Sequence, residues 1–227
     1  MERLPTWTQV SDCALLARFD GPTPEEVQLH LKALFDAIRE SNIQGIRNMH
    51  PAFRSLLVVY DPLVWEPQAL AQRLTQAGRH ADSLPKRAKF VTLPVCFAAR
   101  FAPDLLGISA TAGVEPDEAV QLFTSQIYSV AFLGFAPGFP YLTGLPPSLA
   151  TPRHPRPRTV IQAGSVGIAG EQTGIYPADT PGGWQIIGRT PLRLFDPRRE
   201  PMSLLLPGDE VRFTVIDETG YEELSQW

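Results

Sequence analysis

Three glycines spaced three residues apart surround a serine in the stretch AGSVGIAG, residues 163–170. They are Gly164, Gly167 and Gly170, and Ser165 lies between the first two. Glycine lets backbone N–H groups approach a ligand closely, and several such groups together can hold an anion. The pattern therefore predicts either an anion-binding loop that includes Gly164, Ser165 and Gly167, or a tight turn between two strands.

A second candidate for chemistry is Arg189, which follows Gly188 in the largely apolar stretch WQIIGRTP. An unpaired buried charge is strongly unfavourable, and the planar guanidinium matches the geometry of carboxylates and phosphates. We therefore expect Arg189 either to meet an anionic substrate or to form a structural ion pair with an Asp or Glu of this chain.

The uncharged stretch GFAPGFPYLTG, residues 134–144, is rich in aromatic side chains and is interrupted by Gly and Pro. Such a segment cannot continue a helix, and it is more aromatic than an ordinary solvated loop. We expect it to turn at Pro137–Gly138 and to present Phe139 and Tyr141 along a groove beside Trp184. Aromatic walls exclude water, and a dry site strengthens hydrogen bonds to an anion. Simple packing at a barrel corner is the alternative.

Other common chemistries are not indicated by the sequence. The four histidines are scattered, and neither a metal-binding motif nor the G-x-S-x-G and G-x-x-x-x-G-K-[ST] patterns occur. We expect no metal site in this chain. Cys13 and Cys96 are far apart and lie in apolar stretches, so we expect two reduced thiols in protein cores.

Charge and composition exclude several classes of partner. The 227 residues include 20 basic and 24 acidic side chains, and the basic ones form no block that could bind nucleic acid. No apolar run reaches the roughly 18 residues that a membrane span needs. The first residues lack the basic and then apolar order of a signal peptide. We expect a cytoplasmic protein that binds a small molecule and neither nucleic acid nor membrane.

Residues 1–86 have the pattern of a small α/β domain. Val27, Leu31, Leu34 and Ile38 form one apolar stripe at helical spacing, and the helix is expected to begin near Pro24 with Thr23 as its cap. A second helix is expected at 66–78. Strands are expected at 13–19, 43–48 and 53–60, and a further strand at 89–97, just past this range, is expected to complete the order. This βαββαβ order favours a ferredoxin-like unit.

Residues 87–227 have a different character. One helix is expected at 115–126, and the remainder alternates short apolar runs with Gly and Pro turns. Several short strands separated by turn residues are typical of a closed β-barrel. The fold class is therefore α+β, with a ferredoxin-like domain at 1–86 and a β-barrel domain at 87–227.

The segments FLGFAPGFPYL, PRTVIQAGSVGIAGEQTGIYP and PGGWQIIGRTPLRLFD, in this order, closely resemble the allophanate hydrolase subunit 1 family. The resemblance extends from about residue 8 to residue 216. This family includes the B subunit of bacterial 5-oxoprolinase and a sporulation-kinase inhibitor, and it is similar to half of the carboxyltransferase region of urea carboxylase. The resemblance implies an N-terminal α/β domain followed by a cyclophilin-like β-barrel.

It also implies a reaction and its partners. In such a 5-oxoprolinase, the B subunit acts with the C subunit, of the allophanate hydrolase subunit 2 type, and with a third subunit, and the complex uses ATP to open 5-oxoproline to glutamate. ATP is then a substrate shared with the partner subunits, and this chain is expected to be inactive alone. We place three residues in the catalytic set: Ser165, Tyr176 and Arg189. We place six in the substrate-binding set: Phe139, Tyr141, Gly164, Gly167, Gln172 and Trp184.

Two other functions share the same motifs. One is a binding protein that inhibits a histidine kinase. The other is a subunit of an allophanate hydrolase or urea carboxylase, which would need another protein to carry biotin. The chain departs from the family pattern at Ala98 and Ala99, where relatives tend to have two glycines, and at Phe123, where they tend to have a histidine before Thr124. If that histidine transfers protons in relatives, this chain has lost it.

Overall fold

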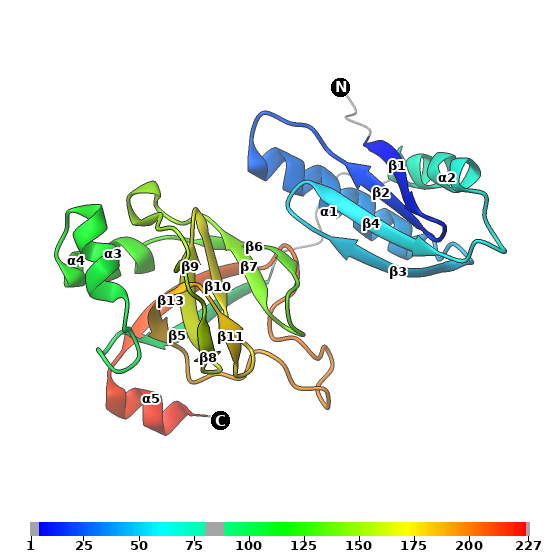
Figure 1. Ribbon diagram of the computed structural model, residues 1–227. Coiled ribbons are helices and arrows are strands. Elements are labelled where there is room, and N and C mark those ends of the chain that lie inside the picture. The colour runs from blue at the N-terminus through cyan, green and yellow to red at the C-terminus, as the bar shows by residue number, and fades with distance from the viewer. Residues whose placement is uncertain (1–4, 80–88, 226–227) are drawn as a thin grey trace. The chain divides into compact units, whose positions relative to one another are not determined.

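The computed structural model of the chain describes residues 5–79 and 89–225. The chain divides into two compact units, Met1–Arg87 and Ala88–Trp227, each with its own hydrophobic core (Figure 1). The domain boundary expected from the sequence, after residue 86, lies outside the described residues.

The first unit contains a four-stranded antiparallel sheet and two helices. In chain order the elements are β1 (Thr6–Ser11), β2 (Ala14–Arg18), α1 (Pro24–Glu40), β3 (Ile46–Pro51), β4 (Ser55–Tyr60) and α2 (Pro67–Arg79). The strands lie in the order β1-β2-β4-β3, and each neighbouring pair is antiparallel.

Helix α1 forms as its sequence predicts. The Thr23 side chain accepts a hydrogen bond from the Glu26 backbone at 3.2 Å, which satisfies a free N–H at the helix start. All four residues of the predicted apolar stripe are buried. They share one core with side chains of β2, β4 and α2.

The ferredoxin-like arrangement of this unit is not confirmed. The strand expected to complete it, at 89–97, is instead strand β5 (Phe90–Cys96) of the second unit. The sheet edge beside β2 is filled by β1, which pairs with β2 through a short hairpin. Strand β1 has no apolar run that would predict it, because most of its side chains are exposed.

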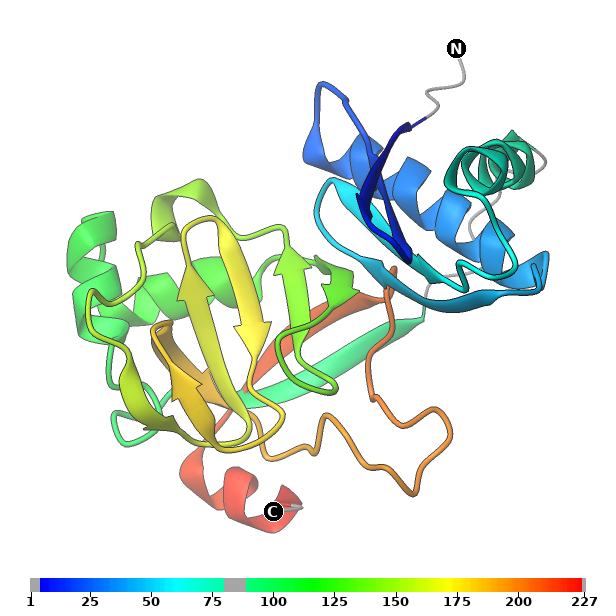
Figure 2. The ribbon, with the colours of Figure 1, turned by 45° about the vertical axis from the view of Figure 1, so that its right-hand side comes forward.

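The second unit is a closed barrel with the strand order β10-β7-β6-β13-β5-β12-β9 (Figure 2). Its strands beyond β5 are β6 (Tyr128–Leu133), β7 (Pro140–Thr143), β9 (Ser165–Ala169), β10 (Gln172–Ile175), β12 (Gln185–Arg189) and β13 (Glu210–Ile216). Two further strands, β8 (Arg158–Ile161) and β11 (Thr180–Gly182), form a separate two-stranded sheet. The predicted closed β-barrel is therefore confirmed, and the cyclophilin-like relationship stays a prediction.

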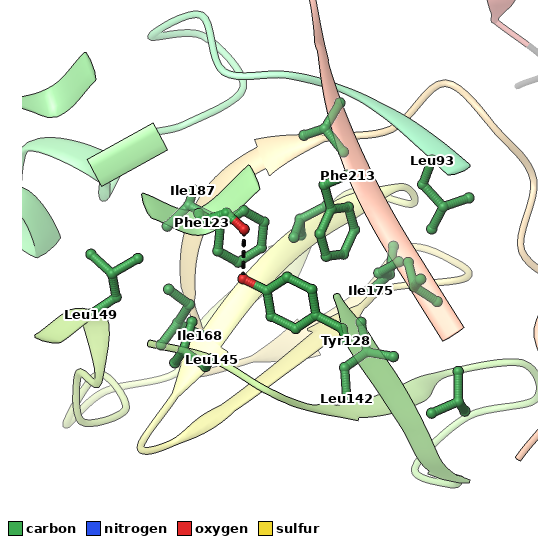
Figure 3. Close-up of a cluster of buried hydrophobic side chains, with 14 of the residues drawn as sticks. Leu93, Phe123, Tyr128, Leu142, Leu145, Leu149, Ile168, Ile175, Ile187 and Phe213 are labelled. Carbon is green, nitrogen blue, oxygen red and sulfur yellow. Dashed lines mark hydrogen bonds between the residues drawn. The ribbon is translucent and has the colours of Figure 1, made fainter. Parts of the chain in front are cut away.

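Helices complete the barrel unit. They are α3 (Leu105–Ala112), α4 (Pro116–Thr124), the 3-10 turn η1 (Pro147–Leu149) and α5 (Glu218–Leu224). Helix α4 confirms the helix predicted at 115–126. It places Phe123 in the barrel core with Tyr128 and Phe213, where the Tyr128 hydroxyl donates to the Phe123 carbonyl oxygen at 2.9 Å (Figure 3).

A second apolar cluster lies on the outer face of strands β9 and β12. Val166 and Ile187 belong to the barrel core, whereas Ala169 and Ile186 belong to this second cluster. Side chains on a strand alternate between its two faces, so both strands bury residues on both sides. The second cluster also contains Phe139, Ile161, Tyr176 and Trp184. It forms the support for the candidate site.

Candidate functional site

A cleft of ≈ 310 Å³ opens beside this second cluster. The loop after β6, strand β7, the segment before β8, the end of β10 and the turn before β12 all contribute to its lining. The lining residues are Phe135, Phe139, Tyr141, Arg153, Pro157, Tyr176, Pro181, Gly182, Gly183 and Trp184. The cleft thus draws on the GFAPGFPYLTG and PGGW stretches together.

Phe139 stands at the centre of the aromatic wall. Its ring centroid lies 5.0 Å from that of Tyr141, 5.2 Å from that of Tyr176 and 5.4 Å from that of Trp184. The two last contacts are edge-to-face, which is a favourable arrangement for aromatic rings. Phe135 adds a further ring at the mouth, where it is 61% exposed and has a φ of 66°. A left-handed backbone at a bulky residue is strained, and such strain is typical of functional sites.

The two tyrosines of the wall keep their protons at neutral pH. Burial raises the pKa of Tyr176 to about 12, although a hydrogen bond from the Trp184 backbone and the charge of Arg153 act in the opposite direction. Burial also raises the pKa of Tyr141, against the effect of Arg153. Both side chains are therefore neutral phenols at this pH.

Arg153 is the one charged residue among those that line the cleft. Its guanidinium lies 5.7 Å from the centroid of the Trp184 ring, within the range of a cation–π contact. The side chain is exposed, and no carboxylate lines the cleft beside it among the residues that the structure describes. The cleft is therefore an aromatic site with a single positive charge.

The backbone on both sides of Arg153 is fixed to the turn that carries Trp184. The Gln185 side chain donates to the Pro152 carbonyl oxygen at 2.9 Å. The His154 N–H donates to the Gly183 carbonyl oxygen at 2.7 Å. The backbone that carries Arg153 is thus fixed beside the aromatic wall.

Asp104, just before helix α3, supports this arrangement from behind. Its carboxylate accepts two hydrogen bonds from Arg158, at 2.6 and 2.9 Å, and one from the Ile186 backbone at 2.6 Å. Nε2 of His154 lies 3.2 Å from the same carboxylate. Burial alone would raise the pKa of Asp104, but the hydrogen bonds from Arg158 and Ile186 outweigh it and hold the pKa below its ordinary value.

Four of the residues predicted from the sequence meet in the cleft: Phe139, Tyr141, Tyr176 and Trp184. A fifth, Gly167, supports the wall from behind, since a Cβ atom there would lie 3.0 Å from Cβ of Trp184. Gln172 begins β10 and pairs with Ala169, and it does not line the cleft.

The predicted anion-binding loop is occupied by the protein's own hydrogen bonds. The Gly164 N–H donates to the Tyr176 carbonyl oxygen at 2.7 Å, and the Ser165 N–H donates to the Gln162 carbonyl oxygen at 3.2 Å. Ser165 is buried and begins strand β9. The alternative interpretation, a tight turn between strands, therefore describes this segment, and Gly164 with its φ of 84° makes the turn.

Arg189 lies at the far end of β12 and does not line the cleft. Its Nε donates to the Ala163 carbonyl oxygen and its Nη1 to the Gln162 side-chain oxygen, each at 2.7 Å. The guanidinium also lies 5.9 Å from the Phe101 ring and 5.8 Å from the Tyr221 ring. Within the described part of the chain it forms no ion pair, so its neighbours are neutral acceptors and aromatic rings and not the expected structural acid.

We expect Arg189→Lys to affect stability more than activity. Lysine keeps the charge but loses the planar fork that holds two acceptors, so the free energy of unfolding is expected to fall by about 1–2 kcal/mol. If the expected complex with partner subunits forms, its kcat/KM should stay within about threefold of the wild type. Thermal melting and steady-state kinetics on one preparation measure both. A loss of about a hundredfold in kcat/KM with an unchanged Tm would instead support the predicted role of Arg189 in anion binding.

Sequence reasoning missed Arg153 and Asp104. The signal for Arg153 was the stretch PRHPRPR, in which three arginines alternate with prolines just before the AGSVGIAG segment. Asp104 carried no local signal, because its partners Arg158 and Ile186 are distant in sequence.

The remaining expectations concern thiols, metals and membranes. Cys96 is buried, and burial raises the pKa of its thiol, whereas Cys13 is half-buried in a turn; neither forms a disulfide. Among residues 5–79 and 89–225, no cluster of three or more His, Cys, Asp or Glu is placed to hold a metal. None of the helices in these ranges has the length and apolar character of a membrane span.

Residues 5–205 match the family model described as carboxyltransferase domain, subdomain C and D. The chain is 40% identical to the B subunit of 5-oxoprolinase from Bacillus subtilis over 224 residues, which cover 94% of this chain and 93% of that protein. It is 48% identical to the B subunit of 5-oxoprolinase from Escherichia coli O157:H7 over 151 residues, which cover 65% of this chain and 69% of that protein.

A solved structure has the same fold. The crystal structure of the protein TTHA0988 matches with a TM-score of 0.79 and 34% sequence identity. The match covers 90% of this chain but only 40% of TTHA0988, so this chain is similar to a part of that longer protein.

Proposed function

This chain belongs to the family of carboxyltransferase domains of the subdomain C and D type, and we propose from this membership that it is the B subunit of a 5-oxoprolinase. The observation that carries the proposal is the identity with the corresponding 5-oxoprolinase subunit of Bacillus subtilis, which extends over nearly the full length of both chains. The fold agrees with a subunit of this kind, since the barrel offers a cleft for a small molecule.

The proposed reaction opens the lactam ring of 5-oxoproline. A lactam is a resonance-stabilised amide, so its hydrolysis gains from coupling to ATP. The γ-phosphoryl group of ATP passes to the lactam oxygen, and ADP leaves. Water adds to the activated carbon, the ring C–N bond breaks as its nitrogen takes a proton, and an acyl phosphate of glutamate results. A second water cleaves the acyl phosphate, and the products are glutamate and phosphate. Such chemistry depends on positioning and on donors for developing negative charge.

The residues of this chain supply a binding site with few reactive groups. The wall of Phe139, Tyr141, Tyr176 and Trp184 excludes water, and the protonated tyrosines offer hydrogen-bond donors. Within residues 5–79 and 89–225, the cleft lining includes no carboxylate that could act as a base or bind the magnesium of a nucleotide. We therefore propose that the general base and the nucleotide site are supplied by the C subunit and the third subunit, and that the complex works in the cytoplasm.

Reconstitution tests this function. We expect the purified chain alone to release no ADP and no glutamate above a blank with 5-oxoproline and ATP. We expect turnover when the chain is combined with a protein of the allophanate hydrolase subunit 2 type and with the third subunit. The measurement is a coupled assay for ADP together with chromatographic detection of glutamate. Turnover by the single chain, or a complete complex that hydrolyses ATP without forming glutamate, contradicts the proposal.

A further inference from the structure

We propose that the aromatic cleft binds a small cyclic monocarboxylate, that Arg153 holds its carboxylate and that the aromatic wall holds its ring. The inference deepens the proposed function and rests on it for the identity of the natural ligand, 5-oxoproline, a five-membered lactam that carries one carboxylate. The similarity to 5-oxoprolinase B subunits does not say which residues bind this ligand.

Charge is the first argument. A guanidinium has five N–H donors and cannot lose its charge at physiological pH. Arg153 makes no hydrogen bond or ion pair with other residues in the ranges 5–79 and 89–225; its guanidinium lies over the Trp184 ring and acts electrostatically on Tyr141 and Tyr176. None of the described residues that line the cleft carries a carboxylate that could neutralise it. A planar carboxylate matches this fork with two parallel hydrogen bonds.

The second argument is that the backbone that carries Arg153 is fixed before any ligand arrives. The hydrogen bonds at Pro152 and His154 fix the backbone on both sides of Arg153 to the turn with Gly183 and Gln185. Less backbone conformational entropy is therefore lost on binding than for an arginine on a free loop, which improves affinity.

Size and charge number narrow the ligand class. A volume of ≈ 310 Å³ is at the lower end of the range for small-molecule sites. The nearby Arg158 is not available as a second cation, because its guanidinium is paired with Asp104. A nucleotide would bring several negative charges, whereas one free guanidinium suits a single carboxylate.

The ring and the amide of a lactam also have counterparts. The rings of Phe135 and Trp184 are apolar surfaces that a flat five-membered ring can cover. The hydroxyl of Tyr176, which lines the cleft, keeps its proton because burial raises its pKa to about 12, and a lactam carbonyl oxygen accepts hydrogen bonds. The geometry does not require this tyrosine to transfer a proton.

Three small molecules separate the contributions of carboxylate and lactam. 5-Oxoproline carries both groups, 2-pyrrolidinone has the lactam alone, and cyclopentanecarboxylate has the carboxylate alone. Binding of each compound to the full-length chain is measured by ligand-observed NMR titration at constant ionic strength. We expect 5-oxoproline to bind best and removal of its carboxylate to weaken binding by at least about tenfold, on the scale of a charge-assisted hydrogen bond.

Variants of Arg153 then identify the group that contacts the carboxylate. Arg153→Met is expected to weaken the binding of 5-oxoproline and of cyclopentanecarboxylate by at least about tenfold. The affinity for 2-pyrrolidinone is expected to stay unchanged. Arg153→Lys is expected to recover part of this loss, because it restores the charge without the fork. Arg156→Met is the matched control, since Arg156 is exposed in the same segment but does not line the cleft. Its affinities are expected to equal those of the wild type.

The outcomes separate this inference from the proposed function. The inference is overturned if neither carboxylate binds saturably to the wild-type chain. It is also overturned if Arg153→Met lowers the affinity for all three compounds equally. An assembled complex that opens 5-oxoproline with an unchanged KM in Arg153→Met overturns the inference and leaves the function standing. A carboxylate site that depends on Arg153, in a complex that does not open 5-oxoproline, overturns the function and leaves the monocarboxylate site standing.

Discussion

Asp104→Asn is expected to lower the free energy of unfolding of the barrel unit by about 2–3 kcal/mol at neutral pH. The Asp104 side chain is only 9% exposed, and it joins the start of helix α3 to strand β8 through Arg158 and to strand β12 through the Ile186 backbone. Breaking a buried pair costs about 3–5 kcal/mol, and the partial exposure of Arg158 reduces that figure. Asparagine can still accept one hydrogen bond, but it leaves the guanidinium without a counter-charge.

The loss of unfolding free energy in Asp104→Asn is expected to become smaller as the pH falls. The pKa of Asp104 is lower in the folded chain than in the unfolded chain. Its contribution to stability is therefore present above the unfolded pKa of about 3.9, and it disappears as the pH falls through the folded pKa. The difference between wild type and Asp104→Asn is expected to be complete at pH 7 and to shrink below about pH 4. Urea unfolding at a series of pH values measures it.

Asp196→Asn serves as the matched control. Asp196 also pairs with an arginine, Arg198, but that side chain is 81% exposed and the pair lies at the surface. Surface ion pairs contribute little, so a much smaller change is expected. If Asp104→Asn and Asp196→Asn have equal effects, or if the loss at Asp104 is the same at pH 3 and pH 7, the carboxylate of Asp104 does not have the role described.

The sequence predicted correctly those elements that depend on residues close together in the chain. The stripe of Val27, Leu31, Leu34 and Ile38 predicted α1, and the glycine and proline turns after residue 126 predicted a closed barrel. The assignment of β5 to a sheet could not be made from local patterns, because β5 pairs in parallel with β13, more than a hundred residues away. An apolar strand has the same pattern in either unit, so the strand was predicted in the wrong one.

Some residues of the candidate site could likewise be identified from the sequence, and others could not. The aromatic residues Phe139, Tyr141 and Trp184 were recognisable because Gly and Pro surround them in uncharged stretches. Arg153 and Arg189 were not distinguishable by type, since both are arginines next to Gly or Pro turns. What separates them is the set of acceptors around each guanidinium: Arg189 is held by Gln162 and Ala163, whereas Arg153 faces the cleft. Only the tertiary structure contains that information.

Phe123→Ala is expected to cost about 3–5 kcal/mol in the free energy of unfolding, the usual range for removing a buried aromatic ring. Phe123 is 1% exposed. Its ring packs beside those of Phe213 and Tyr128 (Figure 3). The ring centroids are 4.9 Å apart for Phe213, 5.1 Å for Tyr128 and 6.2 Å for Phe97. Phe123→Leu is the control, because it keeps most of the apolar volume and should cost clearly less. Equal losses in the two variants would show that the ring packing contributes little.

The same position tests the departure from the family pattern. Phe123 lies in the barrel core, and the cleft is lined by a different set of residues. A histidine among Phe97, Tyr128 and Phe213 would bury polar nitrogens beside aromatic rings, so Phe123→His is expected to lower stability without raising the kcat/KM of the assembled enzyme. Because proton transfer requires a group within hydrogen-bond reach of the reacting atoms, a histidine in this core has no route to a ligand in the cleft. A clear rise in kcat/KM for Phe123→His would mean that substrate reaches the barrel core, and it would move the candidate site away from the aromatic cleft.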